Sequence, residues 1–205
     1  SFGDPAVRRE WFAQMIQSAL VTTLLGPYRT FSECAASALD MTAARHGVLL
    51  TDEERDAILK GIRRLQPHPD VHESLQRLRS AGLRLATLTN STQEVANAQL
   101  QHAGIRKYFE HAFSADAVHR LKPAPEPYHM AAERLGVTPS EIRLVACHAW
   151  DIAGALHAGC AAAFVARPGM VFDRLVPQPD IVGIDLRDIA EQIVRAEQSD
   201  SPPHS

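Results

Sequence analysis

The stretch LVACHAWDIAGALHAG, residues 144–159, decides the fold of this chain. It opens with the apolar run 144–147, which has the length and composition of a buried strand. His148 and Asp151 follow at once, and a segment rich in small residues then leads to Gly159. A strand that runs directly into a helix is typical of a parallel α/β sheet. Polar side chains at the carboxyl end of such a strand lie where these sheets bind ligands.

The same alternation of strand and helix extends over residues 71–198. We predict strands at 83–90, 111–118, 142–148 and 162–167 and a short one in DIVGID, residues 180–185. Helices are expected at 71–80, 125–135, 151–158 and 186–198, and a further one follows the strand 83–90 and ends at about residue 102. This order predicts a Rossmann-like parallel sheet that is covered by helices on both faces.

The residues before this core have a helical pattern. Asp4 and Pro5 can begin a helix, the GPYRT segment at 26–30 interrupts the pattern, and TDEE at 51–54 is a capping box for a third helix. QPHPD, residues 66–70, is the expected linker. We therefore predict a helical cap subdomain over 1–66, an α/β core over 67–198 and a disordered tail over 199–205.

Composition narrows the functional classes. The 205 residues are 45% hydrophobic and 22% charged, with a formal net charge of −3 and 21 scattered basic residues, so neither nucleic acid nor membrane is an expected partner. The N-terminus has no apolar signal core. Three cysteines without CxxC spacing indicate free thiols in a reducing compartment, and a cytoplasmic protein is expected. A homodimer is left open.

Three polar loops should meet at the carboxyl edge of the predicted sheet. They contain Thr89 with Asn90, then Lys122, then His148 with Asp151. Each has a simpler interpretation by itself: helix capping for the first loop and for Asp151, and an ordinary surface lysine for Lys122. Their order and spacing along the chain favour a functional interpretation.

This ordered set resembles the haloacid dehalogenase superfamily, and most of all its type II L-2-haloacid dehalogenase branch. LATLTNST at 85–92 resembles the second motif, LKPAPEPY at 121–128 the third, and VACHAWDIAGALHAG at 145–159 the fourth. The resemblance implies a hydrolase that cleaves the carbon–halogen bond of a small 2-haloacid through an aspartyl-ester intermediate. It also implies a small carboxylate as the partner, and no cofactor or metal.

The resemblance also implies roles for individual residues. Thr89 and Asn90 would bind the carboxylate or the leaving group, and Lys122 would pair with the nucleophile. Asp151 would orient Lys122 and help to activate the water. Tyr128 would support the lysine or the substrate, and His148, at a position where this branch usually has an asparagine, would contact the substrate. The apolar wall of the pocket would be formed by Trp150, Ile16, Phe31 and Phe12. Phe12 stands at a position that commonly holds an arginine.

Two features depart from the family pattern. No DxxGT-like motif occurs in the 205 residues, so the central strand that carries the aspartate nucleophile is expected to be missing from this chain. Cys147 stands where related phosphatases have a magnesium-binding aspartate, and a thiol is a poor ligand for this hard cation. The alternatives are a magnesium-dependent phosphatase of the same superfamily and a non-catalytic remnant or fragment that acts as a binding domain.

Overall fold

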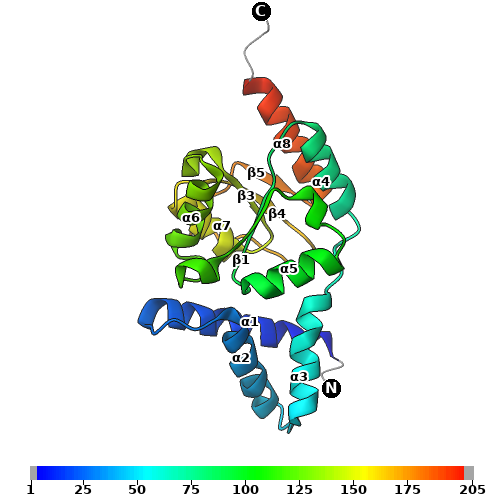
Figure 1. Cartoon of the computed structure of the whole chain (residues 1–205), viewed down its shortest axis with the longest axis vertical. Helices are drawn as coiled ribbons and strands as arrows, with labels where there is room; N and C mark the ends of the chain where they lie inside the picture. Colours follow the sequence, from blue (N-terminus) through cyan, green and yellow to red (C-terminus); the bar gives the residue numbers. More distant parts are fainter. Residues whose placement is uncertain (1–3, 201–205) are drawn as a thin grey trace, which may run out of the picture. The chain divides into compact units, whose positions relative to one another are not determined.

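The computed structural model describes residues 4–200 (Figure 1). Internal contacts divide the chain into two compact units, which are described separately. Unit 1 contains the residues up to Gln66 together with Leu88–Arg106 and Ala112–Pro127, and unit 2 contains Pro67–Thr87, Lys107–His111 and the residues from Tyr128 onward. The division after Gln66 coincides with the predicted linker, whereas two core segments group with the N-terminal helices. The predicted limits of cap and core stay a prediction.

Unit 1 begins with three helices whose first turns are stabilised by side chains. They are α1 (Pro5–Leu25), α2 (Phe31–Arg45) and α3 (Asp52–Gly61), and the 3₁₀ turn η1 (Ile62–Arg64) follows α3. The Asp4 carboxylate accepts a hydrogen bond from the Ala6 N–H at 2.8 Å. The predicted capping box of α3 is present, between Thr51 and Glu54. These contacts satisfy N–H groups that the first turn of a helix leaves unpaired.

The core of unit 1 joins α1 and α2 to the loop that carries Lys122. Its buried side chains are those of Met15, Ala19, Cys34, Ala35, Ala38, Ala115 and Leu121. The Trp11 indole donates a hydrogen bond to the Ala35 carbonyl at 2.9 Å. Small residues on α2 allow the two helices to approach closely, and this contact fixes which face of α1 is turned outward from α2.

Two strands each contain a position along the chain at which one unit ends and the other begins. They are β1 (Ala86–Thr89), followed by α5 (Gln93–His102), and β2 (His111–Ser114), and the 3₁₀ turn η2 (Arg106–Tyr108) lies between α5 and β2. The predicted strand 111–118 was wrong in its second half, where residues 115–118 form the 3₁₀ turn η3 (Ala115–Val118). The cause is local, because the Ser114 hydroxyl accepts a hydrogen bond from the Asp116 N–H at 3.1 Å and turns the chain.

Unit 2 holds the remaining α/β elements. These are α4 (Val71–Ser80), α6 (Pro125–Leu135), which begins at the end of unit 1, the turn η4 (Pro139–Glu141), β3 (Arg143–Ala146), α7 (Ala149–His157), β4 (Ala161–Val165), β5 (Ile181–Gly183) and α8 (Leu186–Asp200). The strands β3, β4 and β5 pair in parallel, with Val145 opposite Ala163 and Phe164 opposite Val182. Helices α4 and α8 lie side by side (Figure 1).

The α/β fold with parallel strands is confirmed, but the strands form two sheets in place of the single predicted one. The order is β1–β2 in one sheet and β3–β4–β5 in the other. All residues of β1 and β3 are only half-buried, although central strands of a covered parallel sheet are normally buried on both faces.

Helix α8 is longer than predicted. It continues through Ser199 and Asp200, which the sequence placed in the disordered tail. The rest of that tail, residues 201–205, lies outside the described residues. Within residues 4–200 no helix combines the length and the apolar character needed to cross a membrane.

A buried ion pair holds three segments of unit 2 together. The Arg167 guanidinium donates to both carboxylate oxygens of Asp70, at 3.0 and 3.1 Å, and the Leu186 N–H donates to the same carboxylate at 2.7 Å. Burial alone would raise the pKa of the Asp70 carboxyl, but the hydrogen bonds from Leu186 and Arg167 outweigh it and lower the pKa below its usual value. The start of α4, the end of β4 and the start of α8 are thus tied to one charge.

We expect Asp70→Ala to lower the free energy of unfolding by about 3 kcal/mol at neutral pH, because it leaves the mostly buried Arg167 without its partner. Glu73→Ala, which removes the exposed partner of Arg187 at the same α4–α8 contact, should cost less than about 1 kcal/mol. The pKa of Asp70 is lowered in the folded state, so its contribution is complete above the unfolded pKa and is lost as the pH falls through the folded value. Urea unfolding of both variants at pH 7 and below pH 4 measures these changes in the free energy of unfolding. Equal effects of Asp70→Ala and Glu73→Ala at pH 7 would contradict the role of the Asp70–Arg167 pair.

Candidate active site

The turn between β1 and α5 presents a group of small polar side chains in unit 1. The Ser91 N–H donates to the Thr89 hydroxyl oxygen at 3.1 Å, and the Ser114 hydroxyl donates to the Ser91 carbonyl at 2.6 Å. Thr92 is the N-cap residue of α5, but its side chain makes no capping hydrogen bond. Simple helix capping therefore does not account for this polar group.

Asn90 and Lys122 hold each other through a reciprocal pair of hydrogen bonds. The Lys122 N–H donates to the Asn90 side-chain oxygen at 2.7 Å, and the Asn90 amide nitrogen donates to the Lys122 carbonyl at 3.2 Å. The Asn90 side chain is buried. The Asn90 amide therefore fixes the backbone that carries Lys122, and the predicted contact of Asn90 with the substrate stays a prediction.

Lys122 is a buried cation. Only 7% of the residue is exposed, and its ammonium group donates a hydrogen bond to the Leu88 carbonyl at 3.0 Å. The alternative interpretation as an ordinary surface lysine was therefore wrong. Burying an ammonium group is costly unless hydrogen bonds and opposite charge surround it, so a buried lysine at a strand end is more typical of a functional site than of a structural one.

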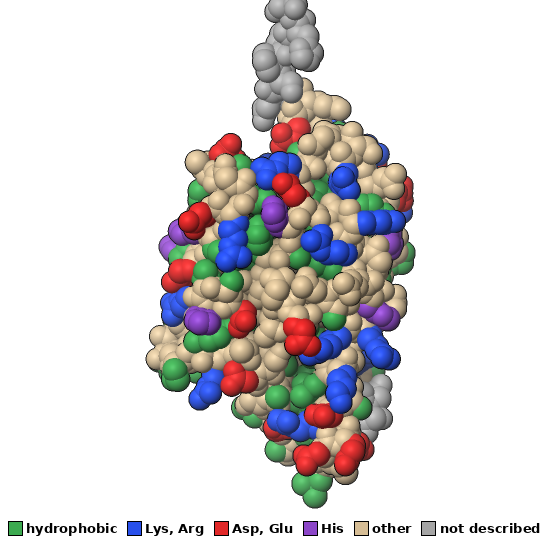
Figure 2. All heavy atoms as spheres, viewed as in Figure 1, with side chains coloured by type: hydrophobic (Ala, Val, Ile, Leu, Met, Phe, Trp, Pro, Cys, Tyr) green, Lys and Arg blue, Asp and Glu red, His purple; other side chains and the backbone are tan. Residues whose placement is uncertain are grey.

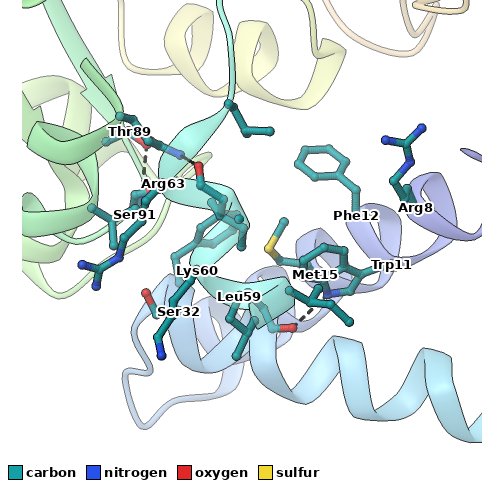
Figure 3. A pocket seen from close by; sticks show the side chains of 18 of the residues that line it. Arg8, Trp11, Phe12, Met15, Ser32, Leu59, Lys60, Arg63, Thr89 and Ser91 are labelled. Atoms are coloured by element: carbon teal, nitrogen blue, oxygen red, sulfur yellow. Dashed lines mark hydrogen bonds between the residues drawn. The ribbon is translucent and has the colours of Figure 1, made fainter. Parts of the chain in front are cut away.

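An apolar cavity of about 740 Å³ lies within unit 1, beside the hydroxyl groups of Thr89 and Ser91 (Figure 3). Its wall is formed by α1, the start of α2, the α3–η1 segment and the β1–α5 turn, and its apolar members include Trp11, Phe12, Met15, Phe31, Leu59 and Ile62. Thr89 and Ser91 contribute hydroxyl groups. Phe12, Phe31 and Thr89, all predicted site residues, thus line one cavity. Ile16 is not among its lining residues, whereas its neighbour Met15 is.

Tyr128 and Asp151 form a buried pair in unit 2. The Tyr128 hydroxyl donates to the Asp151 carboxylate at 2.6 Å and lies 3.1 Å from the Asp151 carbonyl. The two residues are 2% and 6% exposed. Burial, and next the charge of Asp151, raise the pKa of Tyr128, so the phenol remains a hydrogen-bond donor at any ordinary pH. Tyr128 therefore positions the Asp151 carboxylate.

The start of α7 differs from the prediction. His148, not Asp151, is the N-cap residue, and its side chain makes no capping hydrogen bond. Asp151 lies inside the first turn, where the helix dipole favours a carboxylate. The half-buried His148 ring stacks on Trp150 with 5.7 Å between the ring centroids. The interpretation of HAWD as a helix start capped by Asp151 was therefore wrong.

Cys147 precedes this group at the end of β3. Its sulfur lies 3.7 Å from Nδ1 of His148. Burial raises the pKa of the thiol, and the nearby Arg167 offsets this only in part. The thiol is therefore neutral near pH 7, and a neutral thiol does not replace a carboxylate as a magnesium ligand. Among residues 4–200, no three His, Cys, Asp or Glu side chains are grouped closely enough to hold a metal ion.

The predicted site residues are divided between the two units. Thr89, Asn90, Lys122 and the cavity belong to unit 1, and Tyr128, His148, Trp150 and Asp151 belong to unit 2. The pairing of Lys122 with Asp151 stays a prediction. Arg8 also lines the cavity and was not among the residues that the sequence predicted. Arg8 could have been found, because it precedes Phe12 by four residues and lies on the same helix face.

This chain is similar to haloacid dehalogenases and to their family. The model of the haloacid dehalogenase-like hydrolase family matches residues 7–159. The (S)-2-haloacid dehalogenase of Pseudomonas sp. strain YL is 32% identical over 88% of this chain and 78% of its own length. The haloacetate dehalogenase H-2 of Moraxella sp. strain B is 31% identical over 83% of this chain and 76% of its own length. The structure of L-2-haloacid dehalogenase from Xanthobacter autotrophicus with chloropropionic acid covalently bound superposes with a TM-score of 0.86 at 26% identity, covering 92% of this chain and 85% of that one.

Proposed function

Because the chain belongs to the haloacid dehalogenase-like hydrolase family, we propose that it forms the substrate-binding and charge-stabilising part of a hydrolase that cleaves the carbon–halogen bond of a small 2-haloacid. The observation that carries the proposal is the buried Lys122, whose backbone is held by the Asn90 amide and whose ammonium donates to the Leu88 carbonyl near the carboxyl end of β1. A cation held in this way stabilises an ionised carboxylate beside it. The relatives named above are 2-haloacid and haloacetate dehalogenases, and their names support the substrate class.

The proposed chemistry has two steps. In the first, an aspartate oxygen attacks C2 of the haloacid, a carbon–oxygen bond forms, and the halide leaves with the bonding electrons. In the second, water attacks the carbonyl carbon of the resulting ester. This step releases the 2-hydroxy acid and a proton and restores the aspartate. The related Xanthobacter enzyme is described with chloropropionic acid covalently bound, which supports a covalent route.

The described residues have separate tasks in this scheme. Lys122 holds the nucleophilic carboxylate ionised, and the Thr89 hydroxyl and the turn around Ser91 offer donors to the leaving halide or the substrate carboxylate. Asp151, held by Tyr128, takes the proton of the attacking water. The apolar wall that contains Phe12 and Phe31 excludes water from the carbon that reacts. His148 and Trp150, in unit 2, are proposed as further substrate contacts.

The nucleophile belongs to a segment that these 205 residues do not contain. No DxxGT-like motif occurs in the sequence. The test of the function therefore uses a longer form of the protein, in which an aspartate-bearing strand is joined ahead of residue 1; it is called the aspartate-bearing form below. We expect it to release halide and 2-hydroxypropionate in equal amounts from (S)-2-chloropropionate. Failure to do so in a folded preparation, with no haloacid binding, would favour the non-catalytic binding domain.

Magnesium distinguishes the dehalogenase from the phosphatase alternative. Because Cys147 is a neutral thiol at the position of a ligand carboxylate, we expect EDTA to leave halide release by the aspartate-bearing form unchanged within about twofold. Calorimetry should detect no tight Mg²⁺ binding, whereas Cys147→Asp should create measurable Mg²⁺ affinity. Loss of activity with chelator and recovery with Mg²⁺, together with phosphate release from p-nitrophenyl phosphate, would support the phosphatase instead.

A further inference from the structure

Among residues 4–200, two of the basic residues that line the apolar cavity of unit 1 form ion pairs with carboxylates and a third does not. Three basic residues line it, namely Arg8, Lys60 and Arg63. The Lys60 ammonium lies 3.4 Å from the Asp56 carboxylate, and the Arg63 guanidinium lies 2.7 Å from the Glu94 carboxylate. Within residues 4–200, the guanidinium of Arg8 forms no ion pair. Arg8 is therefore the lining cation whose charge is available to a ligand.

The position of Arg8 on α1 suits this task. It lies one helical turn before Phe12, and residues four apart project from the same face of a helix. Figure 3 shows both side chains projecting from α1 to the same side, and both line the cavity. The first turn of α1 contains no acidic residue, and a cation there is disfavoured by the helix dipole. Stabilisation of the helix therefore does not explain the arginine.

A carboxylate ligand in this cavity would need such a group. Most of its wall is apolar, including Trp11, Phe12, Met15 and Leu59. A carboxylate that enters an apolar cavity loses hydration and needs charged hydrogen-bond donors in return. A guanidinium can donate two parallel hydrogen bonds to a carboxylate, which gives affinity and also fixes its orientation.

We propose that Arg8 is the specificity-determining residue that holds the substrate carboxylate at the rim of the cavity, while the apolar part of the acid lies against the wall formed by Phe12 and Met15. This assignment rests on the proposed function, because it takes a carboxylic acid as the substrate. It predicts that the preference of the site for an acid over its neutral amide comes from Arg8. Sequence analysis assigned the region around Phe12 only an apolar role.

The test compares the binding of 2-chloropropionate and of 2-chloropropionamide to the 205-residue chain by ligand-observed NMR titration. Arg8→Gln should weaken binding of the acid about tenfold or more, which is the effect of losing one charge-assisted hydrogen-bond pair, and should leave the amide unchanged. Arg9→Gln is the matched control, since it removes the same charge from the next residue, which does not line the cavity. In the double variant Arg8→Gln/Phe12→Arg, a guanidinium one turn along the same face should restore the preference for the acid.

The outcomes separate the two proposals. If the wild-type chain prefers the acid and Arg8→Gln behaves like Arg9→Gln, the role of Arg8 is overturned while the proposed function stands. If the wild-type chain binds neither ligand, both are overturned. Equal weakening of the acid and the amide by Arg8→Gln would assign Arg8 a structural role, which also overturns the proposal, and thermal unfolding of each variant identifies that case.

Discussion

Steady halide release from 2-chloropropionate should be absent in a homogeneous preparation of the 205-residue chain, although the chain binds the acid. Lys122 and the Thr89 hydroxyl can polarise a substrate, but neither supplies the carboxylate that forms the ester. Asp151 is a carboxylate, yet it is 6% exposed and accepts a 2.6 Å hydrogen bond from Tyr128, which makes it a weak nucleophile. The effect is all or none, because the step that breaks the carbon–halogen bond has no nucleophile.

Two control preparations make this result decisive. The aspartate-bearing form should release halide at a steady rate, and the same form with its added aspartate changed to asparagine should not. Both can be followed with a chloride electrode under identical conditions. Steady release by the 205-residue chain, at a rate proportional to protein concentration and unaffected by further purification, would show that another residue is the nucleophile.

The second large effect is expected from Lys122→Met in the aspartate-bearing form. Methionine fills nearly the same volume but removes the buried positive charge, so the nucleophile is no longer held ionised and positioned. We expect kcat to fall about a thousandfold, the size of effect seen when one preorganised electrostatic group is removed, while KM changes only a few-fold. Steady-state kinetics on (S)-2-chloropropionate measures both constants.

Lys60→Met is the control for this variant. Lys60 also lines the cavity, but its ammonium is mostly exposed and already paired with Asp56, so kcat should remain within about threefold of the wild-type value. Circular dichroism checks that both variants fold. A loss of kcat smaller than tenfold in Lys122→Met would mean that Lys122 does not act on the reacting carboxylate.

Local signals in the sequence were sufficient for much of the fold. The capping box at Thr51 and Glu54 placed the start of α3, and helices α4 and α6 have their predicted limits. The same signal occurs at Thr30 and Glu33, where the structure also forms a capping box, and it could have been used. Such features depend on contacts between near neighbours, so the sequence alone predicts them well.

Features that depend on distant contacts were harder to predict. The division into two sheets depends on which strands pair, and no single strand sequence determines that. The role of Asn90 depends on Lys122, 32 residues away, whose backbone binds both ends of the amide. The spacing of Arg8 and Phe12 on one helix face can be read from the sequence, but the ion pairs that Lys60 and Arg63 form with carboxylates cannot. In each case the property arises from packing between elements.

The central claim is that Lys122 and its surroundings serve an aspartate that forms an ester with a 2-haloacid. The most direct measurement is the intact mass of the aspartate-bearing form, with Asp151 changed to asparagine to slow ester hydrolysis, after incubation with (S)-2-chloropropionate. The account predicts a mass increase of one carboxyethyl group on the added aspartate, and none when that aspartate is changed to asparagine or when the 205-residue chain is used. Halide release without any adduct, or the same adduct on the 205-residue chain, would contradict it.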